Sequence, residues 1–428
     1  MKQTYQDNKL ENGLRVITAP ADSSRSLSVM IMANAGSRFE EKKSSGLSHF
    51  MEHMFFKGAK RYPNTMAVAG AIDSIGGVFN AFTSEDKVAY YVKLSATKKE
   101  VAFDLLSDMI FNSKFESEEI EREKGVIIEE IRMYNDDPMS KVQQDFKQNF
   151  FGDQPLGWDI AGPESNINAF QRVDFLNYVE KFYHPSNLLL AVAGNINPQE
   201  SMELASKYFN QKGADGAQTY SPLPFKLLDQ PASSLTTRDI EQAHFVLGLE
   251  AVAIDHQDEM GLKVINNILG QTMSSRLFYQ VRERRGLAYY IGSSLPLYSD
   301  TGLIKISAGV NVDKVGDALS CVADEILKME ADGITEDELH KGKENIKGRL
   351  DLSLEDSMSQ ATLYATAAIM RKKIKTADDI VNEIDALRLE DLNRIAKKYF
   401  KLANTKMTIL GPFEDIEPFE RSLKEKAS

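Results

Sequence analysis

The stretch Gly46-Leu47-Ser48-His49-Phe50-Met51-Glu52-His53-Met54-Phe55-Phe56-Lys57-Gly58 contains the run H-x-x-E-H, the reverse of the commoner H-E-x-x-H zinc motif. On a helix, residues four apart share one face, so both imidazoles can bind one metal ion. The glutamate beside them then stands next to the position that a catalytic zinc site keeps for water. Ser44 and Ser45 can cap the start of this helix and Gly58 can close it. The run predicts a zinc site on a helix.

The length and composition narrow the class of protein. A chain of 428 residues predicts two domains of roughly 200 residues each. A net charge of −12 argues against nucleic acid or an anionic membrane as partner, and no run is long enough to cross a bilayer. The single cysteine, Cys321, excludes an internal disulfide and fits a reducing compartment. No signal sequence precedes the first expected strands, so we expect a cytoplasmic protein.

The order strand-helix-helix-strand-strand-helix occurs twice along the chain. The first half has expected strands at 14–18, 26–33, 77–82, 88–94 and 188–193, and expected helices, besides the motif helix, at 65–75, 98–112, 118–134 and 198–208. The second half has expected strands at 243–249, 288–294, 301–309 and 406–410, and expected helices at 258–269, 274–282 and 312–329. This repetition predicts an α+β fold of two homologous α/β-sandwich domains, each a mostly antiparallel sheet with helices.

The expected domain boundaries follow a change in composition. Glycine and proline gather over 211–235, which predicts a linker between a zinc-binding domain over 1–210 and a homologous domain over 236–428. The second domain has no H-x-x-E-H run, so we expect one metal ion per chain.

A third metal ligand is needed, because a catalytic zinc site has three protein ligands. The charged helix over 118–134 supplies several glutamates, although such a run is usually a solvated helix face. Glu123 and Glu130 lie seven residues apart, on one face near the edge of an isoleucine stripe. The residues alone leave Glu129 and Glu130 as alternatives for the third ligand.

Two motifs carry a family resemblance. The stretch around the H-x-x-E-H run, together with Glu123-Lys124-Gly125-Val126-Ile127-Ile128-Glu129-Glu130, resembles the two signatures of the pitrilysin and mitochondrial processing peptidase family of zinc metallopeptidases, and most closely its bacterial two-domain type. The resemblance covers nearly the whole chain. It implies that Glu130 is the third zinc ligand beside His49 and His53, and that Glu123 is an accessory acid.

The same resemblance implies a peptide-binding site. The run from Arg282 to Tyr289 is similar to a family motif in which the arginine anchors substrate carbonyls and the tyrosine donates to the oxyanion. The strand containing Asn80, Ala81 and Phe82 resembles the edge strand on which relatives bind substrate by β-addition, through main-chain bonds that do not read side chains.

These observations predict a zinc metalloendopeptidase for unfolded or short peptides, with Glu52 as general base. Four-domain relatives enclose a chamber, so a two-domain chain is expected to form half of a clamshell and to act as a homodimer. Arg282 and Tyr289 would then act on the zinc site of the other subunit. The alternatives are the zinc-bearing subunit of a heterodimeric peptidase and a non-catalytic peptide-binding or structural relative.

The remaining histidines have no chelating spacing, and we expect them to be surface or structural residues: His184, His244, His256 and His340. Cys321 lies in a helical pattern and is expected to be packed rather than reactive.

Overall fold

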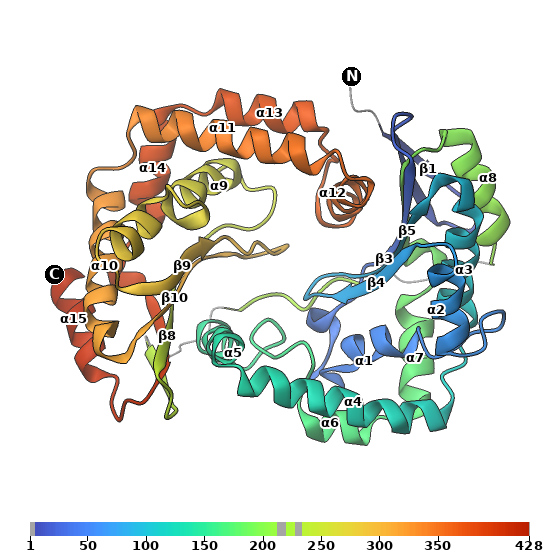
Figure 1. Cartoon of the computed structure of the whole chain (residues 1–428), viewed down its shortest axis with the longest axis horizontal. Helices are drawn as coiled ribbons and strands as arrows, with labels where there is room; N and C mark the ends of the chain where they lie inside the picture. Colours follow the sequence, from blue (N-terminus) through green and yellow to red (C-terminus); the bar gives the residue numbers. More distant parts are fainter. Residues whose placement is uncertain (1–4, 212–219, 227–232, 428) are drawn as a thin grey trace. The chain divides into compact units, whose positions relative to one another are not determined.

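The computed structural model describes residues 5–211, 220–226 and 233–427, which form two compact units (Figure 1). The first unit consists of Met1–Ile131, Asp159–Leu223 and Leu350–Asp378. The second unit consists of Arg132–Trp158, Pro224–Arg349 and Asp379–Ser428. Each unit therefore includes a segment from the other half of the sequence. Of the expected linker over 211–235, residues 212–219 and 227–232 lie outside the described residues.

The first unit contains a sheet with the spatial order β1-β2-β6-β3-β5-β4. In chain order its strands are β1 (Gln6–Lys9), β2 (Arg15–Pro20), β3 (Ser26–Ala33), β4 (Val78–Thr83), β5 (Val88–Ser95) and β6 (Leu188–Gly194). All neighbouring strands run antiparallel except β2 and β6, which are parallel. Strand β4 is at an edge of the sheet, where its outer side pairs with no described strand.

Helices cover both faces of this sheet. In β3, Val29 and Ile31 belong to a core formed with helices of the N-terminal half, whereas Met30 and Met32 belong to a second core on the opposite face. Helix α12 (Ser357–Met370) covers that second face (Figure 1). Strands buried on both sides read as continuous apolar runs, which accounts for the sequence of β6.

The other helices of the first unit surround the first core. In chain order they are η1 (Ser37–Phe39), η2 (Lys42–Ser44), α1 (Leu47–Met54), α2 (Thr65–Asp73), η3 (Ala96–Lys98), α3 (Lys99–Asn112), α4 (Ser117–Asp136), α6 (Glu164–Ala169), α7 (Arg172–Phe182), η4 (Pro185–Asn187) and α8 (Pro198–Tyr208). The boundary between the two units falls inside α4, whose residues up to Ile131 belong to the first unit.

The second unit repeats the same sheet plan in the order β7-β11-β8-β10-β9. Its strands are β7 (Ser233–Thr237), β8 (Gln242–Glu250), β9 (Ala288–Ser294), β10 (Leu303–Asn311) and β11 (Lys406–Gly411). Only β7 and β11 are parallel, as are β2 and β6 at the equivalent place in the first unit. This shared topology confirms the predicted duplicated α+β fold with mostly antiparallel sheets.

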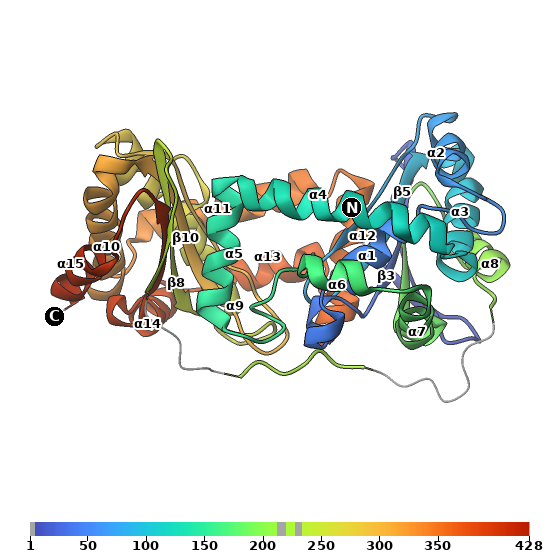
Figure 2. The same cartoon turned by 90° about the horizontal axis from the view of Figure 1, so that it is seen from below.

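One face of the second sheet is covered by α5 (Pro138–Phe151), which comes from the N-terminal half (Figure 2). Its Phe146 packs so closely on β8 that a Cβ atom at Gly248 would lie 2.2 Å from the ring. The other helices of this unit are α9 (Glu259–Asn266), the π-helical η5 (Asn267–Gln271) and η6 (Phe278–Glu283), η7 (Val312–Lys314), α10 (Val315–Ala331), α11 (Glu336–Ser353), α13 (Ala377–Ala386), α14 (Leu389–Tyr399), η8 (Leu402–Asn404) and α15 (Glu417–Ala427). The end of α11, from residue 350, and the start of α13, up to residue 378, belong to the first unit.

Two local expectations were wrong. The motif helix is not capped by Ser44 or Ser45: its N-cap is Gly46, and the carboxylate of Glu40 accepts from the backbone N–H groups of Gly46 and Ser48 at 3.0 and 2.6 Å. Nor does Gly58 close the helix, which already ends at Met54. The buried carboxylate of Glu40, six residues before Gly46, thus replaces the expected serine cap.

In the part of the chain that the structure describes, no helix has both the length and the apolar character that a membrane span requires.

Candidate metal centre

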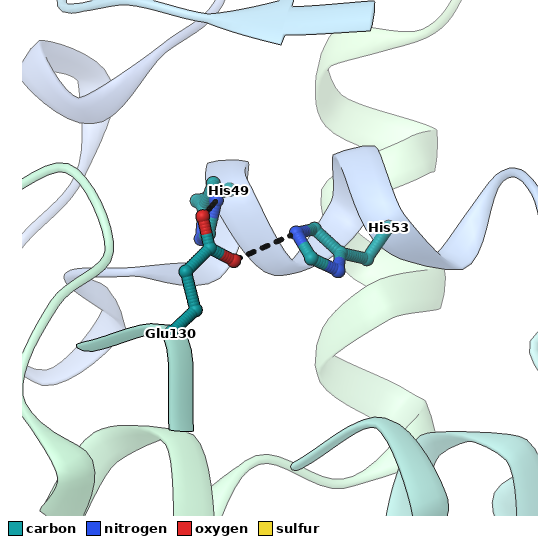
Figure 3. A group of neighbouring side chains, drawn as sticks. All are labelled: His49, His53 and Glu130. Carbon is teal, nitrogen blue, oxygen red and sulfur yellow. Dashed lines mark ion pairs between the residues drawn. The ribbon is translucent and has the colours of Figure 1, made fainter. Parts of the chain in front are cut away.

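Helices α1 and α4 bring the two predicted histidine ligands and Glu130 together (Figure 3). Helix α1 presents His49 and His53 one turn apart. Its N-cap, Gly46, has a left-handed conformation with φ 99°. A Cβ atom there would lie 2.5 Å from the carbonyl oxygen of Ala161, so only glycine fits at this point.

The distances within the cluster match those of a metal site. Nε2 of His49 lies 3.7 Å from Oε1 of Glu130, and Nε2 of His53 lies 3.4 Å from its Oε2. The candidate ligand atoms all lie within 4.8 Å of one another, and no other such group occurs among the described residues. A tetrahedral zinc with bonds of about 2.1 Å separates its ligand atoms by about 3.4 Å, so two imidazoles and a carboxylate here fit zinc.

Glu123 orients one of the imidazoles. Its Oε1 lies 2.9 Å from Nδ1 of His53, and its Oε2 lies 2.5 Å from Nζ of Lys57. An ionised carboxylate can only accept, so Nδ1 carries a proton and Nε2 is the nitrogen left for a metal. His49 has no equivalent support, because its buried Nδ1 has no hydrogen-bond partner among the described residues.

The two histidines differ in basicity. Burial, with a smaller contribution from His53, lowers the pKa of His49, which keeps its imidazole neutral near pH 7. Burial alone would also lower the pKa of His53, but hydrogen bonds to Glu123 and Glu130 outweigh it and raise that pKa to about 9. A metal ion at this site would therefore displace a proton from His53.

The three glutamates also differ. Burial raises the pKa of Glu52, although the hydroxyl of Thr83 donates to it. A hydrogen bond from His53 lowers the pKa of Glu130, and hydrogen bonds from His53 and Lys57 lower that of Glu123 against the effect of its burial. Glu52 is thus the most basic of the three, which suits a general base, while the other two stay ionised.

Comparisons with known proteins agree with this arrangement. Residues 15–164 match the family model described as Insulinase (Peptidase family M16), and residues 169–346 match the model described as Peptidase M16 inactive domain. A Bacillus subtilis protein named "Uncharacterized zinc protease YmxG" is 35% identical over 91% of this chain and 94% of its own length. The chain belongs to peptidase family M16. This confirms the resemblance to the pitrilysin and processing peptidase family, of the bacterial two-domain type.

Further relatives support the same family. A protein of Mycobacterium leprae, also named an uncharacterized zinc protease, is 31% identical over 97% of this chain and 93% of its own length. The crystal structure of a protease from Helicobacter pylori superimposes with a TM-score of 0.90 at 25% identity, covering 96% of this chain and all of the other. The names of these relatives describe proteases, two of them zinc proteases, and the model matching 169–346 is named inactive.

The predicted peptide-docking residues lie on the edge strand β4 of the first unit. Asn80 Oδ1 accepts from the backbone N–H of Ala81 at 2.8 Å, and Phe82 packs toward the α12 face. The edge position leaves the outer main-chain groups of β4 unpaired by any described strand, which is the arrangement that addition of a peptide strand would need.

The second predicted motif belongs to the second unit. Arg282 lies in η6, with its guanidinium carbon 4.9 Å from the ring centroid of Phe278. Tyr289 lies on β9 with 62% of its surface exposed, so its hydroxyl is available to a ligand.

The alternative ligand Glu129 is exposed and lies outside the cluster. Cys321 is buried, and burial raises the pKa of its thiol. His184 and His244 are buried next to the hydroxyls of Ser186 and Tyr290, at 2.9 and 3.0 Å respectively.

Sequence reasoning missed three residues that support this M16 site: Glu40, Lys57 and Thr83. The hydroxyl of Thr83 donates to Oε2 of Glu52 at 2.5 Å. A signal for Thr83 existed, because it follows the predicted docking residues in a strand whose alternate side chains share one face. The contact of Lys57 with Glu123 is tertiary, and the contacts of Glu40 with Gly46 and Ser48, six and eight residues on, do not follow the spacing of a usual helix cap.

Proposed function

We propose that this M16 protein is a zinc metalloendopeptidase that cleaves unfolded or short peptides, with one zinc per chain. The observation that carries the proposal is the cluster of His49, His53 and Glu130, with the basic carboxyl group of Glu52 on the same helix as the two histidines. Its relatives' names support a zinc protease but specify neither mechanism nor substrate.

The residues of the chain divide the chemistry between them. Bound zinc would polarise the scissile carbonyl and lower the pKa of water. Glu52 takes a proton from a water molecule as the water oxygen bonds to the carbonyl carbon. It then gives that proton to the leaving amine as the C–N bond breaks. Glu123 holds His53 in one tautomer throughout, and hydrogen bonds in the site keep both Glu123 and Glu130 ionised.

Peptide would bind in an extended form along β4. The main chain of Asn80, Ala81 and Phe82 pairs with the main chain of the substrate, so binding needs an unfolded segment and reads little of its sequence. Arg282 would hold substrate carbonyls, and Tyr289 would donate to the oxyanion that develops on the carbonyl.

The first experiment measures metal content by mass spectrometry for the wild type, Glu130→Gln and Glu129→Gln. We expect one zinc per chain in the wild type and in Glu129→Gln, and loss of zinc in Glu130→Gln. Zinc retained in Glu130→Gln but lost in Glu129→Gln would move the ligand to Glu129. Absence of zinc from all three proteins would contradict the metal site.

The second experiment measures cleavage of an unfolded peptide. Chelation should abolish cleavage and added zinc should restore it, while Glu52→Gln should retain zinc without activity. Full activity of metal-free protein would contradict the proposal. A wild type that holds zinc and binds peptide without cleaving it would favour a heterodimer subunit or a non-catalytic relative.

We further propose a homodimer in which Arg282 and Tyr289 act on the zinc site of the other subunit. The support is the presence of both motifs in one two-domain chain and the four-domain organisation of larger relatives. Mixing Glu52→Gln chains with Tyr289→Phe chains tests this, because a mixed dimer would contain one intact site. Activity that stays at the level of the single variants would contradict action in trans. The cytoplasmic location stays a prediction.

A further inference from the structure

Thr83 holds the carboxyl group of Glu52 by one oxygen. Its Oγ1 donates to Oε2 of Glu52 at 2.5 Å, and no described residue hydrogen-bonds to the other oxygen, Oε1. Thr83 is the last residue of β4, and alternation along the strand puts it on the same face as Phe79, whose ring lies 5.6 Å from that of Phe56 after the motif helix. One oxygen is therefore fixed, and the other is left to accept a proton.

The chain after Thr83 is clamped. The backbone N–H of Ser37 donates to the carbonyl of Ser84 at 3.2 Å, and that of Arg38 donates to the carbonyl of Glu85 at 3.0 Å. A Cβ atom on Gly36 would lie 2.5 Å from both carbonyl oxygens, so the two segments are in direct contact.

A buried ion pair completes this clamp. Nη1 of Arg38 lies 3.1 Å from Oδ1 of Asp86, and the two side chains are 0% and 5% exposed. A broken buried pair leaves an uncompensated charge, which resists opening of the turn. The hydroxyl of Thr83 therefore occupies a fixed point relative to the motif helix.

We propose that Thr83 is a positioning residue that orients Glu52 for proton transfer. Strand β4 then fixes the position of both the bound peptide and the general base. This inference rests on the proposed function. Because Asn80, Ala81 and Phe82 precede Thr83 on the same strand, a peptide added to β4 is placed in register with the carboxyl group that acts beside it.

The test compares Thr83→Val, which removes the hydroxyl at nearly constant volume, with Thr83→Ser, which keeps it. We expect kcat of Thr83→Val to fall roughly tenfold to hundredfold, as expected for a displaced general base, with KM changed less than about threefold. Thr83→Ser should recover most of kcat. Zinc affinity and melting temperature should match those of the wild type, since no ligand is touched. Thr97→Val, an exposed change in the same unit that also removes a hydroxyl hydrogen bond, is the control.

The outcomes distinguish a failure of the inference about Thr83 from a failure of the proposed function. Unchanged kcat in Thr83→Val, or a loss of zinc and thermal stability that accounts for its lower activity, would overturn the inference. If Thr83→Val does not fold, Thr83→Ala removes the same hydroxyl without an added methyl group and is judged by the same criteria. A wild type without zinc or cleavage overturns the proposed function and this inference together, whereas an active wild type beside an equally active Thr83→Val overturns this inference alone.

Discussion

Glu40 anchors the helix that carries both histidines, and it makes the stability of the protein depend on pH. Its side chain is 2% exposed, and its two oxygens accept from the backbone N–H groups of Gly46 and Ser48. Burial raises the pKa of Glu40 to about 7, against the opposing effect of these hydrogen bonds. The free energy of unfolding should therefore respond to its ionisation near neutral pH.

The sign and size of the effect follow from this pKa. In the unfolded chain the carboxyl group titrates near 4.5, so the folded state holds the proton more tightly. The stability associated with that proton is fully present below pH 4.5 and is lost as the pH rises through about 7. At about 1.4 kcal/mol per pKa unit, the loss is about 3 kcal/mol.

The substitution Glu40→Gln removes this titration. Relative to the wild type, the variant should gain about 3 kcal/mol between about pH 4.5 and 8. At every pH the variant also loses about 1–3 kcal/mol of stability, because the amide nitrogen of Gln cannot accept from one of the two backbone N–H groups. Below about pH 4.5 the variant is therefore expected to be less stable than the wild type.

Urea unfolding followed by circular dichroism measures the difference. A chelator should be present throughout, so that proton release on metal binding does not contribute. Glu41→Gln, an exposed change at the next residue, is the control and should alter stability by less than about 0.5 kcal/mol. A difference between Glu40→Gln and wild type that stays constant within about 0.5 kcal/mol from pH 4.5 to 8 would refute the reasoning.

Three further predictions follow from the packing and the second layer of the site. Glu123→Gln should weaken zinc binding about 10- to 100-fold in a chelator competition assay, while the exposed Glu118→Gln on the same helix should not. Gly248→Ala drives a methyl group into Phe146 and should cost about 1–3 kcal/mol in urea unfolding, whereas Gly348→Ala, with no atom within 4 Å, should be neutral or stabilising. A fragment that ends before the predicted linker lacks α12, so the sheet face that α12 covers should be exposed and bind a hydrophobic dye. A compact fragment with no dye binding would show that this face does not need α12.

Most strands were predictable because they have a strong local pattern, whereas the expected strands did not include β1 and β7, and β7 overlaps the expected linker. The expected strand at 26–33 coincides with β3, and that at 288–294 coincides with β9, since apolar residues and turn residues mark their ends. The continuous apolar run of β6 is typical of a strand buried on both faces, as the structure shows it to be. It could not indicate which helix covers the second face, because α12 lies more than 150 residues away in the sequence and its partner is chosen only in the folded chain.

The residues of the site that lie on one helix were predictable, and the choice that depends on tertiary contacts was not. Spacing on one helix brought out His49, Glu52 and His53, because residues at i, i+3 and i+4 meet without any tertiary information. It left Glu129 and Glu130 as alternatives, since a single residue of offset on α4 decides which carboxyl group faces α1.

Each unit includes helices from the other half of the sequence, and this gives the C-terminal half, which lacks the zinc motif, a structural role. The metal cluster, Glu52 and strand β4 all lie in the first unit, yet α12, which buries one face of their sheet, comes from the C-terminal half. In α12, Ala361, Tyr364 and Ala365 cover apolar side chains of β3 and β6 that would otherwise face water. The metal cluster therefore depends on both halves of the chain for its stability, whatever Arg282 and Tyr289 do. Loss of activity on truncation is thus no evidence of a catalytic role for the second copy, and only point substitutions that leave α12 in place can assign one.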